Sequence, residues 1–471
     1  MILADKKTAA IIMAAIVVAI FTVIFHALIP YILLAGIAAT VAGLLFNWEN
    51  SIPLLILAIA PFHGIIAAAF DNPMINIWKE ALVAIFILKK IVLLVIKKET
   101  WPPIPINYPI WVFIGICLMH GFVAHNIYVA ALSVKILVFF ILFFFMFINI
   151  PTSEKYAYSM IIIFLLTGIV TGAFGILQFT SGSEFFSQLT YLPKITNQVV
   201  SFAEQDVLFW RAFSTFAGPG FFAHYLVMAL FLSIAVLLFP SYKQLRLLAI
   251  ICIAVCSPAL VMTFVRSAWF AFALGCAALA VTKKVKALLY FGILWCLLIF
   301  LAPLALNRIK STFTASDTSY NIRREQTTLV GLKNMVRHPF GVGLETLGGR
   351  FDLKTGAAVG LYIPGTDKRL VGWLPDNQYV SIALQLGWAG LAAYIWILLT
   401  SLRTAWKEMG NSKDNMAAIL NATAFCVLIQ ISLAGFAGEF VEAFPLSLLA
   451  GCFLALPFVY QKISIETNDG I

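Results

Sequence analysis

Long apolar stretches alternate with short polar segments along almost the whole chain. A helix of about 18 or more apolar residues is long enough to cross a hydrocarbon layer roughly 30 Å thick. The pattern predicts about 12 to 14 membrane-spanning helices. These cover residues 8–29, 31–46, 52–70, 76–96, 108–124, 127–149, 157–179, 218–239, 244–263, 265–282, 286–305, 378–400, 415–434 and 439–460.

The composition supports this interpretation. Of the 471 residues, 62% are hydrophobic and only 11% are charged, which excludes an ordinary soluble globular domain. The predicted fold class is therefore an all-α, polytopic integral membrane protein. The seven cysteines all lie in apolar stretches, which argues against a disulfide framework or a zinc site. We expect no cofactor and no nucleic-acid partner.

Lysine and arginine in the short loops indicate the orientation, because these residues collect on the cytoplasmic side of membrane proteins. With the N-terminus in the cytoplasm, Lys97-Lys98, Lys283-Lys284 and Arg403 all fall on that side. Two long segments then face outward. The predicted organisation is N-terminal membrane helices at 1–179, an external loop at 180–217, membrane helices at 218–305, a long external loop at 306–377 and C-terminal membrane helices at 378–471, within a single membrane domain.

The predicted external loops are rich in arginine and lysine, although the orientation rule exempts long loops. Such residues could form a solvated face or contact anionic lipid head groups. They could also bind a ligand that carries phosphate, because the planar guanidinium of arginine holds two oxygens at once. Composition alone leaves both interpretations open.

Two cations lie inside predicted spans, where an isolated charge is costly. Arg266, in "TFVRSAW", lies just inside the outer end of a helix. It either extends to the membrane surface or lines a polar cavity, and its position favours the cavity. Lys135, in "ALSVKILVFF", lies deeper and has no acidic residue nearby in sequence. It is a candidate cavity-lining cation.

Four sequence elements follow one another between residues 211 and 400. They are "RAFSTFAGPGFFAHYLVMALFL" from Arg211, "TFVRSAW" around Arg266, "RREQTTLVGLKNMVRHPFGVGLE" from Arg323 and "DNQYVSIALQLGWAGLAAYIWIL" from Asp376. Each is similar to a motif of the O-antigen ligase and polymerase superfamily, and they occur in that family's order. Outside these elements the chain resembles the family only in its hydropathy.

The resemblance implies an enzyme at the outer face of the cytoplasmic membrane. Members of the family take an oligosaccharide from undecaprenyl pyrophosphate and transfer it to a hydroxyl of an acceptor glycan. Polymerases use another lipid-linked repeat unit as the acceptor, whereas ligases use the lipid A core. The expected partners are thus the lipid-linked oligosaccharide, the acceptor glycan and membrane lipids, with a chain-length regulator and a flippase as further candidates.

Breaking a sugar–pyrophosphate bond requires cations that stabilise the negative charge of the leaving group. The resemblance assigns this role to Arg266 and to Arg323 or Arg324, with Arg211 binding phosphate or organising a loop. A solvated helix face is the alternative for Arg323 and Arg324. Adjacent helical residues point in different directions, so only one of that pair is expected to face the site. Glu439 and Glu442, at the predicted outer edge of the last span, are expected partners of these arginines.

The family's ligases carry histidine where this chain has Asp376. A carboxylate can also accept the proton of the acceptor hydroxyl, and the alternative for Asp376 is a helix cap. Asn377 could cap the helix or contact substrate. His338, in "RHPFGVGLE", is a second candidate base or substrate-binding residue, and a structural role in the turn is its alternative. His224 is expected within a span, with a local hydrogen bond.

The missing histidine favours a repeat-unit polymerase over a ligase. A flippase or transporter of lipid-linked sugars is the main alternative from another class. Such proteins usually contain paired or inverted repeats, which this chain lacks. The external loops contain no Asp-x-Asp motif, so we predict a metal-independent glycosyltransferase.

Overall fold

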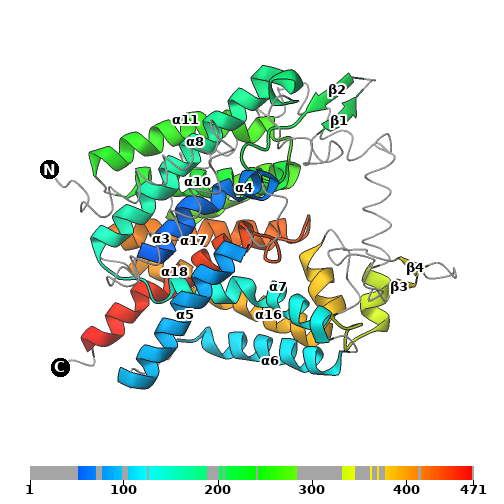
Figure 1. The fold of residues 1–471 in the computed structure, drawn as a ribbon. Coiled ribbons are helices and arrows are strands. Elements are labelled where there is room, and N and C mark those ends of the chain that lie inside the picture. Colours follow the sequence, from blue (N-terminus) through cyan, green and yellow to red (C-terminus); the bar gives the residue numbers. More distant parts are fainter. Residues whose placement is uncertain are drawn as a thin grey trace.

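Long helices lying side by side make up most of the protein, as the computed structural model shows (Figure 1). The structure describes residues 51–69, 77–97, 104–124, 127–187, 201–204, 207–239, 242–283, 331–344, 361–362, 369–370, 377–411 and 415–468. Helices satisfy their own backbone hydrogen bonds, which is why an apolar chain in a bilayer adopts them.

Within the described residues, six helices are long and apolar enough to cross a membrane. They are α7 (Ile127–Phe147), α8 (Glu154–Ser187), α10 (Pro219–Leu238), α11 (Lys243–Met262), α16 (Gln378–Asn411) and α17 (Asn415–Ala434). Shorter apolar helices accompany them: α3 (Ile52–Ile59) with η3 (Ala60–Phe62) and α4 (His63–Ala69), α6 (Asn107–Val123), α12 (Arg266–Lys283) and α18 (Leu446–Asn468). The remaining helix is α5 (Trp78–Lys97). The predicted all-α polytopic membrane fold is confirmed.

Some predicted spans differ from the helices at their ends. The span predicted at 439–460 starts later, because residues 435–445 form an irregular loop before Leu446. α8 continues to Ser187, past the predicted end at 179. The predicted spans 8–29, 31–46 and 286–305 lie outside the described residues, so the predicted count of helices stays a prediction.

Two short hairpins belong to the segments predicted to lie outside the membrane. β1 (Ser201–Glu204) pairs antiparallel with β2 (Val207–Trp210), and β3 (Leu361–Tyr362) pairs antiparallel with β4 (Arg369–Leu370). Figure 1 shows both hairpins at the same end of the helices. Their assignment to two loops on the outer side of the membrane stays a prediction.

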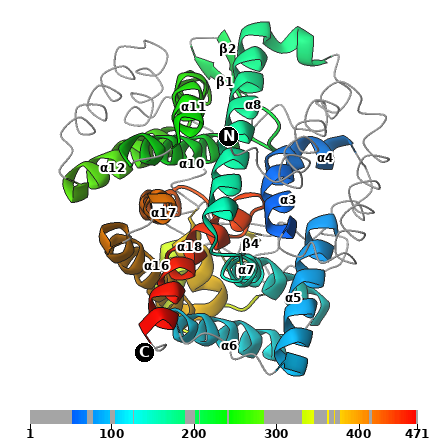
Figure 2. The ribbon, with the colours of Figure 1, turned by 90° about the vertical axis from the view of Figure 1, so that its left-hand side faces the viewer.

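The C-terminal helices form the centre of the packing. α18 packs against α7 and α17, and Figure 2 shows it between them. α11 packs closely on α8 and α10. At Gly168 and Gly172 of α8, an added Cβ would lie 3.4 Å from the Cys252 sulfur and 3.3 Å from the Cys256 sulfur, respectively. Small residues allow such close approach of membrane helices, so these two buried cysteines have a packing role.

α16 contains a sharp break at Gly387, where φ is 72° and ψ is −174°. A turn that follows the helical residues 331–337 fits into this break. The Trp388 N–H donates to the Pro339 carbonyl at 2.9 Å, and the Val342 N–H donates to the Leu384 carbonyl at 2.6 Å. The broken helix therefore exchanges some of its own hydrogen bonds for bonds to the "HPFGVG" turn.

Gly387→Ala is expected to destabilise the protein. An alanine Cβ would lie 2.6 Å from the Phe340 carbonyl carbon, and the backbone conformation is one that essentially only glycine adopts. We expect a loss of at least about 2 kcal/mol, measured as a lower midpoint of unfolding in detergent. Gly410→Ala, on the same helix with open space around it, is the control. An equal midpoint for both variants would contradict the packing of the turn against α16.

Candidate functional site

A pocket of about 450 Å³ lies where α10 and α12 begin and α17 ends. Its lining comes mainly from three segments, residues 217–221, 264–267 and 437–440, together with Arg211 and His224. These segments are far apart in sequence. The pocket is therefore assembled by the tertiary structure at one end of the helices.

Residues 211–218 form a mostly buried connection that leads into α10 and positions one wall of the pocket. The Arg211 Nε donates to the Thr263 carbonyl at 2.9 Å, and the Thr215 hydroxyl donates to the Pro61 carbonyl at 2.6 Å. The Gln178 side-chain oxygen accepts the Ser214 N–H at 2.7 Å. These bonds attach the connection to α8, to η3 and to the turn between α11 and α12. They explain why the polar residues of "RAFSTF" are needed next to apolar helices.

The N-termini of α10 and α12 both border the pocket. The first N–H groups of a helix have no acceptor inside it, and the helix dipole adds partial positive charge there. α10 has no side-chain cap at Gly218, and the space next to Gly220 is open. Helix N-termini are ready-made anion sites. This part of the lining suits a ligand with negatively charged oxygens.

Arg266 is the first residue of α12 and lines the pocket. This location agrees with the cavity interpretation of its position. Arg211 lines the same pocket and bonds to Thr263 in the turn that leads to Arg266, which supports a loop-organising role for Arg211. The two arginines outnumber Glu439, the acidic residue of the lining. The pocket side chains therefore carry net positive charge.

Glu439 and Glu442 lie in the 435–445 loop rather than on a helix. Glu439 lines the pocket together with both arginines. Glu442 accepts hydrogen bonds from Gln378 at 2.6 Å and from Ser381 at 3.2 Å. The Glu442 carboxylate thus attaches the loop to the first turn of α16. Both residues thus precede the last helix, which begins at Leu446 rather than at 439 as predicted.

Asn377 caps α16. Its side-chain oxygen accepts the N–H groups of Tyr379 at 3.0 Å and Val380 at 3.1 Å, the pattern of a helix N-cap. Its side-chain nitrogen donates to the Phe436 carbonyl at 3.4 Å. The predicted capping role of Asn377 is confirmed, while contact with substrate stays a prediction.

Three predicted catalytic residues, Asp376, Arg323 and Arg324, lie outside the described residues. Their roles stay predictions. Asp376 directly precedes Asn377, and the N-terminus of α16 contacts the loop that lines the pocket.

His338 is exposed at the end of the helical residues 331–337. Its N–H donates to the Asn334 carbonyl at 2.9 Å, and its carbonyl accepts the Gly341 N–H at 2.9 Å. It is not among the residues that line the described pocket. These backbone contacts agree with the structural alternative, a turn-shaping role, and a role in chemistry stays a prediction.

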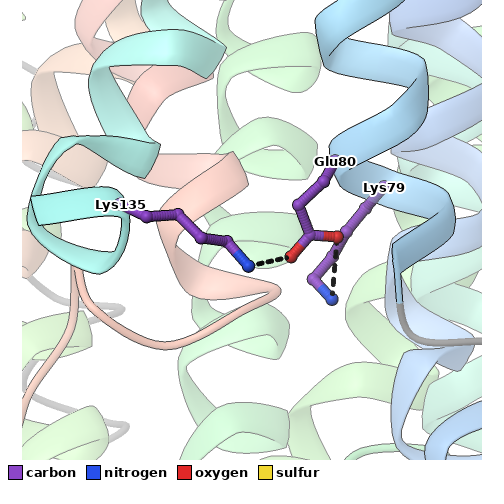
Figure 3. Close-up of polar contacts among 3 residues, drawn as sticks. All are labelled: Lys79, Glu80 and Lys135. Atoms are coloured by element: carbon purple, nitrogen blue, oxygen red, sulfur yellow. Dashed lines mark ion pairs between the residues drawn. The ribbon is translucent and has the colours of Figure 1, made fainter. Parts of the chain in front are cut away.

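Lys135 on α7 has an acidic partner on another helix. Its ammonium lies 2.8 Å from the Glu80 carboxylate of α5, which also lies 3.4 Å from the Lys79 ammonium (Figure 3). Lys135 is not among the residues that line the described pocket. Pairing across helices reduces the cost of such a charge within a span. Sequence proximity could not identify Glu80 as the partner.

His224 is a pocket residue to which the sequence assigned no function. It lies within α10, as expected, but its hydrogen bonds reach Gln430 of α17. The expected local hydrogen bond is therefore wrong. The one available signal was its place in the first turns of the helix that opens after "AGPG".

The fold and the pocket define a polytopic helical membrane protein with a basic, anion-suited pocket at the helix ends. A family model described as O-antigen ligase matches residues 249–395, which include Arg266 and Asp376. This match confirms the resemblance to the O-antigen ligase and polymerase superfamily, and it supports a glycan-transferring function of that general type. A comparison with curated proteins gives no match.

Proposed function

We propose that the protein is a membrane glycosyltransferase that polymerises oligosaccharide repeat units of a cell-surface polysaccharide. Its substrates would be carried on undecaprenyl pyrophosphate at the outer face of the cytoplasmic membrane. The observation that carries the proposal is the pocket in which Arg211 and Arg266 meet the N-termini of two helices. The family match over residues 249–395 supports the reaction type.

The pocket suits the diphosphate of such a substrate. During transfer, the bond between the anomeric carbon and a diphosphate oxygen breaks, and its electron pair leaves with the diphosphate. Fixed positive groups that are already in place stabilise this growing charge without reorganising. We assign this role to Arg266, together with the N–H groups at the start of α10. Arg211 holds the turn that precedes Arg266 and adds its charge to the pocket.

The acceptor side of the reaction is assigned to Asp376. A new bond forms between the anomeric carbon and the acceptor hydroxyl oxygen, and the hydroxyl proton passes to the carboxylate. Asn377 and Gln378 support this assignment by their position. The Gln378 N–H donates to the Gly435 carbonyl at 2.7 Å, and the Gln378 side-chain oxygen accepts the Val441 N–H at 3.0 Å. These bonds connect the start of α16 to both ends of the segment that contains the pocket residues 437–440.

A polymerase is preferred to an O-antigen ligase because aspartate stands where the family's ligases have histidine. The two activities differ in the acceptor and share the diphosphate chemistry. The acceptor must therefore be varied to distinguish them.

The experiment uses purified full-length protein and an undecaprenyl-pyrophosphate-linked oligosaccharide. We expect a ladder of products that differ by one repeat unit, with turnover retained in a chelator because we propose metal-independent catalysis. A single product formed only with a lipid A core acceptor would indicate a ligase instead. Movement of the lipid-linked sugar across a vesicle membrane, without any product, would indicate a transporter and contradict the proposal.

A further inference from the structure

His224 contributes an imidazole to the pocket from the first turns of α10. The residue is buried, with 7% of its surface exposed. The ring of Phe440, another pocket residue, lies edge-on to it with a centroid distance of 5.4 Å. The imidazole therefore packs against Phe440 and belongs to the same pocket lining as Arg211 and Arg266.

Gln430 determines how the imidazole is oriented and protonated. The Gln430 side-chain nitrogen donates to the His224 carbonyl at 2.8 Å, and the same nitrogen lies 3.3 Å from His224 Nδ1. Exchanging the amide nitrogen and oxygen would place two oxygens in contact, so the backbone carbonyl fixes the amide orientation. An amide nitrogen can only donate. Nδ1 therefore accepts, and a neutral ring must carry its proton on Nε2.

The Nε2–H group makes no hydrogen bond to a described residue, although its side chain lines the pocket. An oxygen of a ligand in the pocket could accept a hydrogen bond from this group. Because the proton is already on Nε2, the ring is a donor in this arrangement and is unsuited to act as the base.

We infer that His224 binds a diphosphate oxygen of the substrate through Nε2–H, and that Gln430 positions it for this contact. The inference rests on the proposed function and deepens it by adding a third, uncharged donor beside the two arginines. It also separates the roles in the site. His224 holds the leaving group, so the acceptor hydroxyl must lose its proton to another residue, which the proposal identifies as Asp376.

The first test is binding of farnesyl pyrophosphate to the full-length protein in detergent, measured by isothermal titration calorimetry. His224→Phe keeps a ring of similar shape and removes the donor, so we expect affinity to fall about ten- to a hundredfold, the effect of losing one bond to a charged group. His224→Gln keeps an N–H near the Nε2 position and is expected to regain part of the affinity. His120→Phe, on α6 and not in the pocket lining, is the matched control and should bind normally.

The second test is ¹⁵N NMR of histidine-labelled protein, with His224→Gln used to assign the signal. We expect the Nε2–H tautomer of His224 in the native protein, and a shift of the Nε2 signal when farnesyl pyrophosphate is added. A purely structural histidine would show no such shift. The Nδ1–H tautomer, or unchanged affinity in His224→Phe, would overturn the inference.

The two tests separate the inference from the function on which it rests. If the native protein binds the diphosphate and His224→Phe binds it equally well, the role of His224 is wrong and the proposed function stands. If the native protein binds no diphosphate and forms no ladder, both are wrong.

Discussion

Arg266→Ala is expected to lower the rate of polymer formation by about 100- to 1,000-fold, the usual effect of removing one group that stabilises transition-state charge. Arg266 starts α12 and lines the pocket beside a second helix N-terminus, so water is a poor replacement for its guanidinium. The measurement is the initial rate of ladder formation by purified protein. The folded state is checked by its unfolding midpoint.

Arg266→Lys separates charge from geometry in the same assay. Lysine keeps the positive charge but cannot bind two oxygens with a planar fork, so we expect an activity between those of the native protein and the alanine variant. Arg246→Ala removes an exposed arginine of α11 that does not line the pocket and should retain native activity. Full activity in Arg266→Ala would refute the assignment of the pocket to the diphosphate.

Asp376→Asn is expected to reduce the rate by about 100-fold or more, because a positioned base typically contributes a factor of 10² to 10⁴. The amide keeps the size of the side chain and loses its ability to accept the acceptor's proton. Binding of farnesyl pyrophosphate should remain close to native, since the proposed diphosphate contacts are elsewhere. The measurement therefore combines the rate of ladder formation with calorimetric binding.

Two further variants serve as comparisons for Asp376→Asn. Asp376→Glu retains a carboxylate and should retain more activity than Asp376→Asn. Asp317→Asn changes another carboxylate of the predicted long external loop and is expected to be neutral. If Asp376→Asn turns over normally, the acceptor's proton goes to a different group.

The helices were predictable because a bilayer restricts the chain to structures that satisfy their own backbone hydrogen bonds. Apolar length alone therefore located α7, α10 and α17 within a few residues. Position within a span also singled out Arg266, since an isolated charge there is costly and needs a polar environment.

The features that the sequence did not reveal are mostly contacts between distant segments. The span predicted at 439–460 began too early, although Gly435, Gly438 and Pro445 indicate a loop before α18. Only the structure shows that this loop is bound to α16 through Glu442, which accepts from Gln378 and Ser381. The break in α16 was not predicted, since its hydropathy is continuous and Pro339 supplies the replacement carbonyl. The ion pair of Lys135 was also not predicted, because its partner Glu80 lies on another helix, α5.

The sequence by itself determined the membrane class, the positions of most helices and the family resemblance, because these depend on composition and local order. Only the tertiary structure decided which polar groups meet. It placed Arg211, Arg266 and His224 around one pocket and gave His224 its orientation through Gln430. The physical reason is that hydrogen bonds and ion pairs act over a few ångströms in space, whatever the separation of their partners along the chain.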